Sequence, residues 1–202
     1  MRFIHSNLET VKLKLFDEAI SNIKSTKKNN RLEILELGIG TGENFKHFPK
    51  GSNVTILDKT DIFLPYLNES IKKNNRQDLN VSKLVVSKAE EMIGIESNSM
   101  DVVVHTFMLC SVDDHLKVMN QVYRVLKPGG VCIFMEHSID NVSKERRLLQ
   151  NIMAKILGDR FLDMRKILSS GPYEQLQLKN YEIKRVLITF INPVVYGFGT
   201  KS

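Results

Sequence analysis

Three alternating glycines follow a short apolar run in the stretch "LELGIGTG", and an acidic residue stands two positions ahead of the first. Gly38, Gly40 and Gly42 allow the backbone to turn tightly and to come close to a ligand. The dinucleotide-binding pattern G-x-G-x-x-G needs its third glycine at position 43, where this chain has Glu43. The carboxylate of Glu36 suits a cationic amino-acid group better than a pyrophosphate. The loop therefore predicts a site for a cofactor with a cationic end.

A second acid lies where adenosine-binding sites place one. Asp58 ends the apolar run "NVTILD", 20 positions after Gly38. A carboxylate at the end of a second strand meets the ribose hydroxyls in nucleotide-binding α/β folds. The two features together favour a cofactor site over a glycine-rich turn that binds nothing.

The elements that must position these residues alternate between short apolar runs and amphipathic stretches. We expect strands at residues 33–37, 53–58, 79–87, 100–106 and 129–137. We expect helices before Ser25 and at 42–48, 62–73, 115–126 and 142–157. Two last apolar runs, 181–190 and 194–200, are separated only by "INP", so they should pair antiparallel. The pattern predicts an α/β fold: a Rossmann-like, seven-stranded, mostly parallel sheet with a C-terminal antiparallel β-hairpin and helices on both faces.

Length and composition limit the class of protein. The chain has 202 residues, enough for one domain, and its net charge of +6 is scattered apart from "KSTKKNNR", which we interpret as a solvated loop. We therefore expect no nucleic-acid partner. Two cysteines form neither a zinc site nor a disulfide framework, so no metal is expected.

The lengths of the apolar runs and the N-terminal residues indicate the expected cellular environment. None reaches the roughly 18 residues of a membrane span, so we expect no integral membrane span. No signal peptide is visible, so we expect a soluble, cytoplasmic protein. The sequence leaves the oligomeric state open.

The whole pattern resembles the class I S-adenosylmethionine-dependent methyltransferases. Their first motif is matched by "LELGIGTG", their ribose acid by Asp58 in "ILDK", their adenine-side acid by Glu90 in "SKAEEM", and their later turn by "LKPGG" at residues 126–130. The resemblance implies S-adenosylmethionine as the cofactor. It also implies that the three glycines line the methionine part of the cofactor and that Glu36 lies near its amino group.

The same resemblance assigns the adenosine contacts. It implies that Asp58 holds the ribose, with Lys59 beside it against the adenine, and that Ala89 and Glu90 meet the adenine edge. For Glu90, an ordinary acid at a helix N-terminus is the alternative.

The chain is also similar to the thiol S-methyltransferases of the methyltransferase-like group, close to the ubiquinone and menaquinone C-methyltransferases. The similarity lies in "GENFKHFP", "MDVVVHTFMLCSV", "VYRVLKPGGVCIFMEH" and "PVVYGFGTK". It implies a small-molecule methyl acceptor, in particular an alkyl thiol. A quinone, a lipid or another small acceptor is the alternative, as is an inactive module that only binds the cofactor.

The acceptor should lie over the carboxyl ends of the strands, where open α/β sheets bind ligands. The fourth strand then places several residues near the methyl group, of which we assign two to the cofactor, Thr106 and Leu109. After the fifth strand, His137 is the candidate general base or acceptor-orienting group, because imidazole titrates near neutrality; a turn-capping histidine is the alternative. Asp114 is a second catalytic candidate, with capping of the helix that starts near His115 as its alternative.

We treat residues 1–202 as a single domain with four parts. These are an N-terminal helix and basic loop, a cofactor-binding core, an acceptor cap and a terminal β-hairpin, at residues 1–30, 31–140, 141–180 and 181–202.

Overall fold

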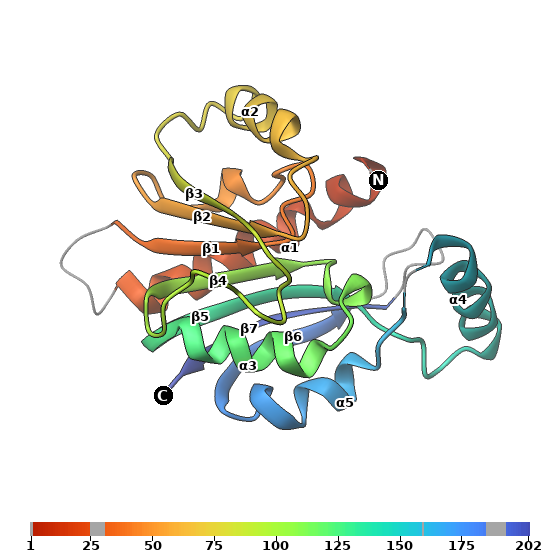
Figure 1. Ribbon diagram of the computed structural model, residues 1–202. Helices are drawn as coiled ribbons and strands as arrows, with labels where there is room; N and C mark the ends of the chain where they lie inside the picture. The colour runs from red at the N-terminus through yellow and green to blue at the C-terminus, as the bar shows by residue number, and fades with distance from the viewer. Residues whose placement is uncertain (1, 25–30, 159, 185–192) are drawn as a thin grey trace.

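The structure, a computed structural model, describes residues 2–24, 31–158, 160–184 and 193–202. Its centre is one seven-stranded sheet with the strand order β3-β2-β1-β4-β5-β7-β6 (Figure 1). The strands are β1 Glu33–Leu37, β2 Asn53–Asp58, β3 Asn80–Val86, β4 Met100–Thr106, β5 Leu126–His137, β6 Leu176–Lys184 and β7 Val194–Lys201. Strands β1 to β5 pair in parallel, whereas β7 is antiparallel to both β5 and β6. The predicted fold class is confirmed.

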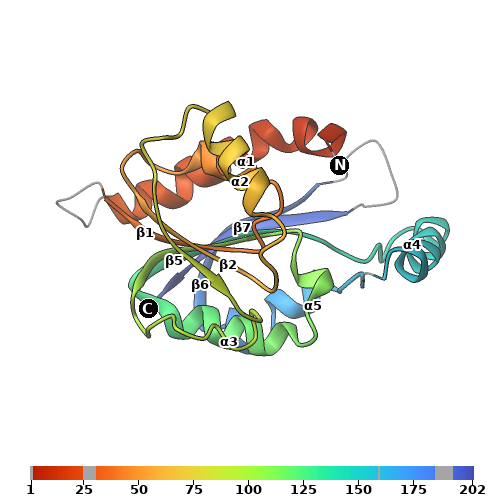
Figure 2. The ribbon, with the colours of Figure 1, turned by 45° about the horizontal axis from the view of Figure 1, so that its top comes forward.

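Helices cover both faces of the sheet, as predicted (Figure 2). The α-helices are α1 Arg2–Lys24, α2 Leu64–Lys73, α3 His115–Val125, α4 Lys144–Leu157 and α5 Met164–Leu168. Three 3₁₀ turns complete the set: η1 Phe45–His47, η2 Leu109–Ser111 and η3 Gly171–Tyr173. One apolar cluster joins α1, α2 and η1 to one face of the sheet, and a second joins α3, α5 and η3 to the other.

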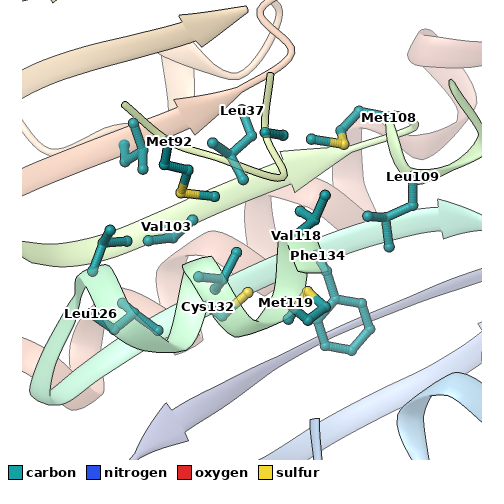
Figure 3. Packing of buried hydrophobic residues seen from close by; sticks show 14 of the residues in the cluster. Leu37, Met92, Val103, Met108, Leu109, Val118, Met119, Leu126, Cys132 and Phe134 are labelled. Carbon is teal, nitrogen blue, oxygen red and sulfur yellow. The ribbon is translucent and has the colours of Figure 1, made fainter. Parts of the chain in front are cut away.

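The core follows from the period of two in the strands. In β1, Ile34 packs in the cluster under α1, while Leu35 and Leu37 pack in the cluster under α3. Figure 3 shows the second cluster, in which the buried face of α3 lies against β4 and β5. Burial of a side chain such as Val118 or Met119 contributes about 1.5–3 kcal/mol. This packing fixes the carboxyl ends of β1, β2 and β4 side by side.

Three predicted boundaries are wrong. The strand expected at 129–137 begins three residues earlier, at Leu126. The helix expected at 42–48 is only the 3₁₀ turn η1, because Gly42 has a left-handed φ of 71° and Pro49 follows the turn. The C-terminal hairpin begins at Leu176 rather than at residue 181, so the predicted cap overlaps strand β6. The strand expected at 181–190 coincides with β6 as far as Lys184, and the rest of it lies outside the described residues.

Helix α4 lies at one end of the molecule, apart from the other helices (Figures 1 and 2). Its apolar residues Leu148, Ile152 and Ile156 are exposed, at 61%, 47% and 70%. In contrast, α5 and η3 bury their side chains beside α3. The predicted acceptor cap is therefore made of one exposed helix and one packed segment. Within the described ranges, no helix is long and apolar enough to cross a membrane.

Candidate active site

A cavity of about 370 Å³ lies at the carboxyl ends of β1, β2 and β4. Six residues predicted from the sequence line it: Gly38, Gly40, Asp58, Lys59, Ala89 and Glu90. Its apolar walls are Phe63, Phe107, Met108 and Val112. A largely apolar cavity with a few converging polar groups is the usual form of a small-molecule site. The topology therefore assembles most of the predicted cofactor contacts in one place.

The glycine loop forms one edge of this cavity. Gly38 has φ +68°, and a Cβ placed on it would lie 3.0 Å from the Cβ of Met108. A side chain is therefore excluded there both by backbone conformation and by contact. Gly42 serves a different purpose, because its missing Cβ makes room for Ser70 of α2, and Gly42 does not line the cavity. Of the three predicted glycines, two face the cavity and one packs the loop against a helix.

Asp58 is buried at the end of β2 and lines the cavity. One oxygen accepts a hydrogen bond from Ile39 N (3.2 Å) and the other from Thr60 N (3.2 Å). Burial raises the pKa of Asp58, although these backbone bonds counteract part of that effect. The carboxylate thus ties β2 to the glycine loop and presents its remaining acceptor capacity to the cavity, as the ribose role requires.

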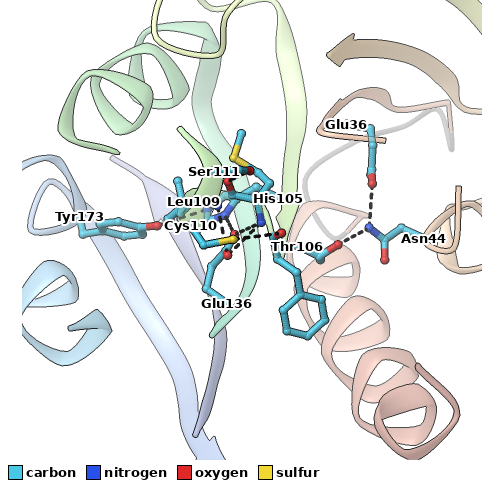
Figure 4. A network of polar contacts seen from close by, with 11 residues as sticks. Glu36, Asn44, His105, Thr106, Leu109, Cys110, Ser111, Glu136 and Tyr173 are labelled. Carbon is cyan, nitrogen blue, oxygen red and sulfur yellow. Dashed lines mark hydrogen bonds and ion pairs between the residues drawn. The ribbon is translucent and has the colours of Figure 1, made fainter. Parts of the chain in front are cut away.

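Glu36 lies on β1 just behind the glycine loop and is 1% exposed. Its Oε1 accepts a hydrogen bond from Asn44 Nδ2 (2.7 Å), and the same Nδ2 also lies 2.9 Å from Thr106 Oγ1 (Figure 4). Its Oε2 is buried without a hydrogen-bond partner among the described residues. Burial raises the pKa of Glu36 to about 8, against the opposing effects of Asn44, Lys12 and His105. A buried carboxylate oxygen without a partner fits a cationic group such as an amino-acid ammonium.

A second buried network holds the loop that follows β4 (Figure 4). Glu136 Oε1 pairs with His105 Nδ1 at 2.7 Å, while its Oε2 accepts hydrogen bonds from Met108 N (3.0 Å) and Leu109 N (3.3 Å). The other ring nitrogen of His105 lies 3.2 Å from the hydroxyl of Tyr173. Burial alone would lower the pKa of His105, but Cys132 and Glu136 beside it raise the value to about 10. These neighbours favour the protonated form of His105, which links Glu136 to Tyr173 inside the core.

Leu109, Asp114 and His137 lie beside the cavity rather than in it. Leu109 is fully buried, and Asp114 accepts hydrogen bonds from Leu116 N (3.0 Å) and Lys117 N (3.1 Å), so it caps α3. That geometry fits the capping alternative for Asp114. His137 stacks on Phe107 with ring centroids 4.2 Å apart, which places it one ring away from the cavity. Glu90 accepts a hydrogen bond from Asp113 N (2.7 Å), so it also fixes the segment before α3.

Two residues of the site were not assigned from the sequence. Asn44 joins Glu36 to Thr106, and Lys12 Nζ donates to Asn44 Oδ1 at 2.9 Å. Lys12 lies on the apolar stripe of α1, four positions after Leu8 and three before Leu15. A lysine on the buried face of an amphipathic helix is the one sequence feature that could have pointed to it.

Comparisons with known proteins agree with this geometry. The model of a methyltransferase domain family matches residues 35–134. The thiol S-methyltransferase TMT1B of Rattus norvegicus is 37% identical over 158 residues, 77% of this chain and 63% of that protein. The thiol S-methyltransferase TMT1A of Homo sapiens is 32% identical over 191 residues, 91% of this chain and 77% of that protein. A solved S-adenosylmethionine-dependent methyltransferase from Methanosarcina mazei has a TM-score of 0.67 at 18% identity, covering 89% of this chain and 96% of its own.

The fold and the site define a class I S-adenosylmethionine-dependent methyltransferase domain. The cavity residues fit that cofactor, because Asp58 lines the cavity where the ribose is predicted and Glu36 has a buried oxygen without a hydrogen-bond partner among the described residues. The chain belongs to the methyltransferase family that includes human TMT1A. It spans less than two thirds of the length of rat TMT1B.

Proposed function

We propose that this protein transfers a methyl group from S-adenosylmethionine to a small-molecule thiol. The observation that carries the proposal is the cavity at the carboxyl ends of β1, β2 and β4, with its glycine edge and the carboxyl groups of Asp58 and Glu90. The choice of a thiol is supported by the names of the relatives from rat and human. The fold alone does not support a thiol, because solved structures with this fold are named for different acceptors, geranyl diphosphate in one and sarcosine and dimethylglycine in another.

The cofactor contacts follow from the lining of the cavity. In this proposal Asp58 binds the ribose hydroxyls, and Lys59, Ala89 and Glu90, which line the same cavity, contact the adenine. Glu36 lies behind the glycine loop, where its free oxygen suits the amino group. These assignments predict which parts of the cofactor each variant should affect.

The chemistry asks little of the protein beyond position. The bound cofactor supplies a methyl group on a sulfonium, and the acceptor displaces it in line. A thiol has an ordinary pKa near roughly 8.5, so a modest shift yields the nucleophilic thiolate. Holding two reactants in line contributes about 7–11 kcal/mol in favourable cases. The fixed loop after β4 and the apolar walls Phe107, Met108 and Val112 serve this purpose by orienting groups and excluding water.

We infer that the methyl acceptor binds on the side of the cavity where Phe107 and His137 lie. The Phe107 ring lines the cavity, and His137 stacks on it from the end of β5. We infer that His137 orients the acceptor or takes up its proton, since imidazole titrates near neutrality. Asp114 is not retained in this role, because its carboxylate caps α3.

The test is the formation of S-adenosylhomocysteine from S-adenosylmethionine with a panel of acceptors: alkyl thiols, sulfide, a demethylated quinone and a phospholipid amine. Turnover with thiols and sulfide but not with the other acceptors is the expected result. Turnover with the quinone or the amine alone would replace the acceptor and keep the reaction class.

The cofactor site is tested by Asp58→Asn, which keeps the size of the side chain and removes its charge. It should weaken binding of S-adenosylhomocysteine by about 1–3 kcal/mol, the scale of a lost hydrogen bond to a charged group. Tight cofactor binding without turnover on any acceptor would instead show an inactive binding module and contradict the proposal.

A further inference from the structure

Lys12 is a charged residue in a place where lysine is rarely found. It projects from α1 into the core and is 1% exposed. Its Nζ makes one hydrogen bond within the described part of the chain, to Asn44 Oδ1 at 2.9 Å, although an ammonium carries three donors. A buried ammonium with donors left over is costly unless another partner completes its shell. Burial accordingly lowers the pKa of Lys12.

Asn44 joins Lys12 to Glu36, and both hydrogens of its amide nitrogen are in use. Its carbonyl oxygen accepts from Lys12, and its amide nitrogen donates to Glu36 Oε1 (2.7 Å) and to Thr106 Oγ1 (2.9 Å). The result is a row of an amine, an amide and a carboxyl group, all buried. At one end of the row, Lys12 has donors that make no hydrogen bond within the described residues. At the other end, Glu36 Oε2 has no hydrogen-bond partner there.

The row lies behind the cavity wall, and its three residues are not among those that line the cavity. Lys12 Nζ is 5.9 Å from the centre of the Phe107 ring, which forms part of the cavity wall. Glu36 stands two residues before Gly38, which forms the edge of the cavity. An amine with unused donors and a carboxyl group with an unpartnered oxygen, held apart by one amide, match a ligand that carries an anion and a cation a few bonds apart. The amino-acid end of S-adenosylmethionine is such a group.

We propose that Lys12 binds the carboxylate of the cofactor's amino-acid end, while Glu36 Oε2 accepts a hydrogen bond from its ammonium. Helix α1 then forms part of the cofactor site, although no motif of the sequence marks it. The assignment rests on the proposed function, because it takes S-adenosylmethionine as the ligand. A purely structural role for Lys12, in which it only neutralises Glu36, makes a different prediction for ligands that lack the carboxylate.

The experiment measures binding by calorimetry for three ligands. S-adenosylmethionine carries both charges, decarboxylated S-adenosylmethionine keeps the amine alone, and 5′-methylthioadenosine lacks the amino-acid end. The wild-type protein should bind the first at least tenfold more tightly than the second. Lys12→Met should abolish that preference and leave the affinity for 5′-methylthioadenosine within about twofold of wild type. This comparison is a double-mutant cycle between one side chain and one ligand group.

Two further variants make the result unambiguous. Lys14→Met removes an exposed lysine two positions along the same helix and should change none of the three affinities. Lys12→Gln is a second neutral variant, which keeps a donor for Asn44 and should lose the preference as Lys12→Met does. Melting temperatures without ligand show that each variant is folded.

The results distinguish binding of the cofactor's carboxylate by Lys12 from a purely structural role of Lys12. Equal losses for the carboxylated and decarboxylated ligands in Lys12→Met would overturn the assignment and leave Lys12 as a support for Glu36. Unchanged affinities would overturn it as well. Failure of the wild-type protein to bind 5′-methylthioadenosine and S-adenosylmethionine would contradict the proposed function itself, independently of Lys12.

Discussion

Replacing Glu36 by glutamine should remove a pH dependence of stability that the wild-type protein carries. The pKa of Glu36 rises from its ordinary value of 4.5 to about 8, chiefly because the side chain is buried. A group whose pKa is higher in the folded state favours folding when it is protonated, so its contribution is fully present below about 4.5 and is lost as the pH rises through 8. Glutamine keeps the shape and an oxygen for Asn44 but has no proton to lose.

The size of the effect follows from the two pKa values. Between them, the unfolded chain releases the proton while the folded protein keeps it, so stability falls by about 1.4 kcal/mol per pH unit. From pH 5.5 to 7.5 the wild-type protein should therefore lose about 2.7 kcal/mol relative to Glu36→Gln. Urea denaturation of both proteins without cofactor at pH 5.5, 6.5 and 7.5 measures this difference, and titrations common to both proteins cancel.

Glu43→Gln is the matched control, because it removes one negative charge from the same loop at a partly exposed position. Its stability difference from wild type should not reproduce the slope seen for Glu36→Gln. A difference between wild type and Glu36→Gln that stays constant over the three pH values would refute the reasoning. It would mean that Glu36 is ionised in the folded protein throughout this range, with Lys12 as its full counter-charge.

Three other substitutions test separate parts of the site. An alanine in the left-handed conformation costs about 1–2 kcal/mol of stability. Gly38→Ala should destabilise the ligand-free protein by more than this, because the new Cβ would also lie 3.0 Å from Met108. A Cβ on Gly40 meets nothing within 4 Å, so Gly40→Ala should show the backbone cost alone in the same urea denaturation assay. Tyr173→Phe leaves a buried imidazole nitrogen without its partner and should cost about 1–3 kcal/mol in the same assay; an unchanged stability would remove the hydroxyl from the network. His137→Phe keeps a ring for stacking and removes both nitrogens, so kcat should fall at least tenfold while the affinity for S-adenosylhomocysteine stays the same; equal turnover would leave His137 a packing role.

The fold could be predicted from the sequence because it depends on repeated local signals. Five apolar runs separated by amphipathic stretches allow few arrangements other than a parallel sheet between helices. The C-terminal hairpin was predicted because the last two apolar runs are too close in sequence for a crossover helix between them. The boundaries at 42–48 and 181 were wrong because a left-handed Gly42, and the full extent of β6, depend on tertiary contacts that a local pattern does not contain.

The cavity-lining part of the site was predictable for a similar reason. Gly38, Asp58 and Glu90 stand in motifs whose spacing from each strand end is fixed by the fold. The contribution of Lys12 was not predictable in this way, because α1 reaches Asn44 through a separation of 32 residues that no motif spans. Asp114 illustrates the opposite case, in which a local rule, helix capping, accounts for the residue fully.

The loop after β4 shows how these distant segments act together. Phe107 has a left-handed φ of 54°, a strained conformation for a bulky residue. On one side, Thr106 is bonded to Asn44 and through it to Lys12 of α1; on the other, Met108 N is bonded to Glu136 and through His105 to Tyr173 of η3. Strain of this kind persists only where the surroundings over-determine the backbone. Two buried networks from opposite faces of the sheet do so here, and they fix the cavity wall on which in-line transfer would depend.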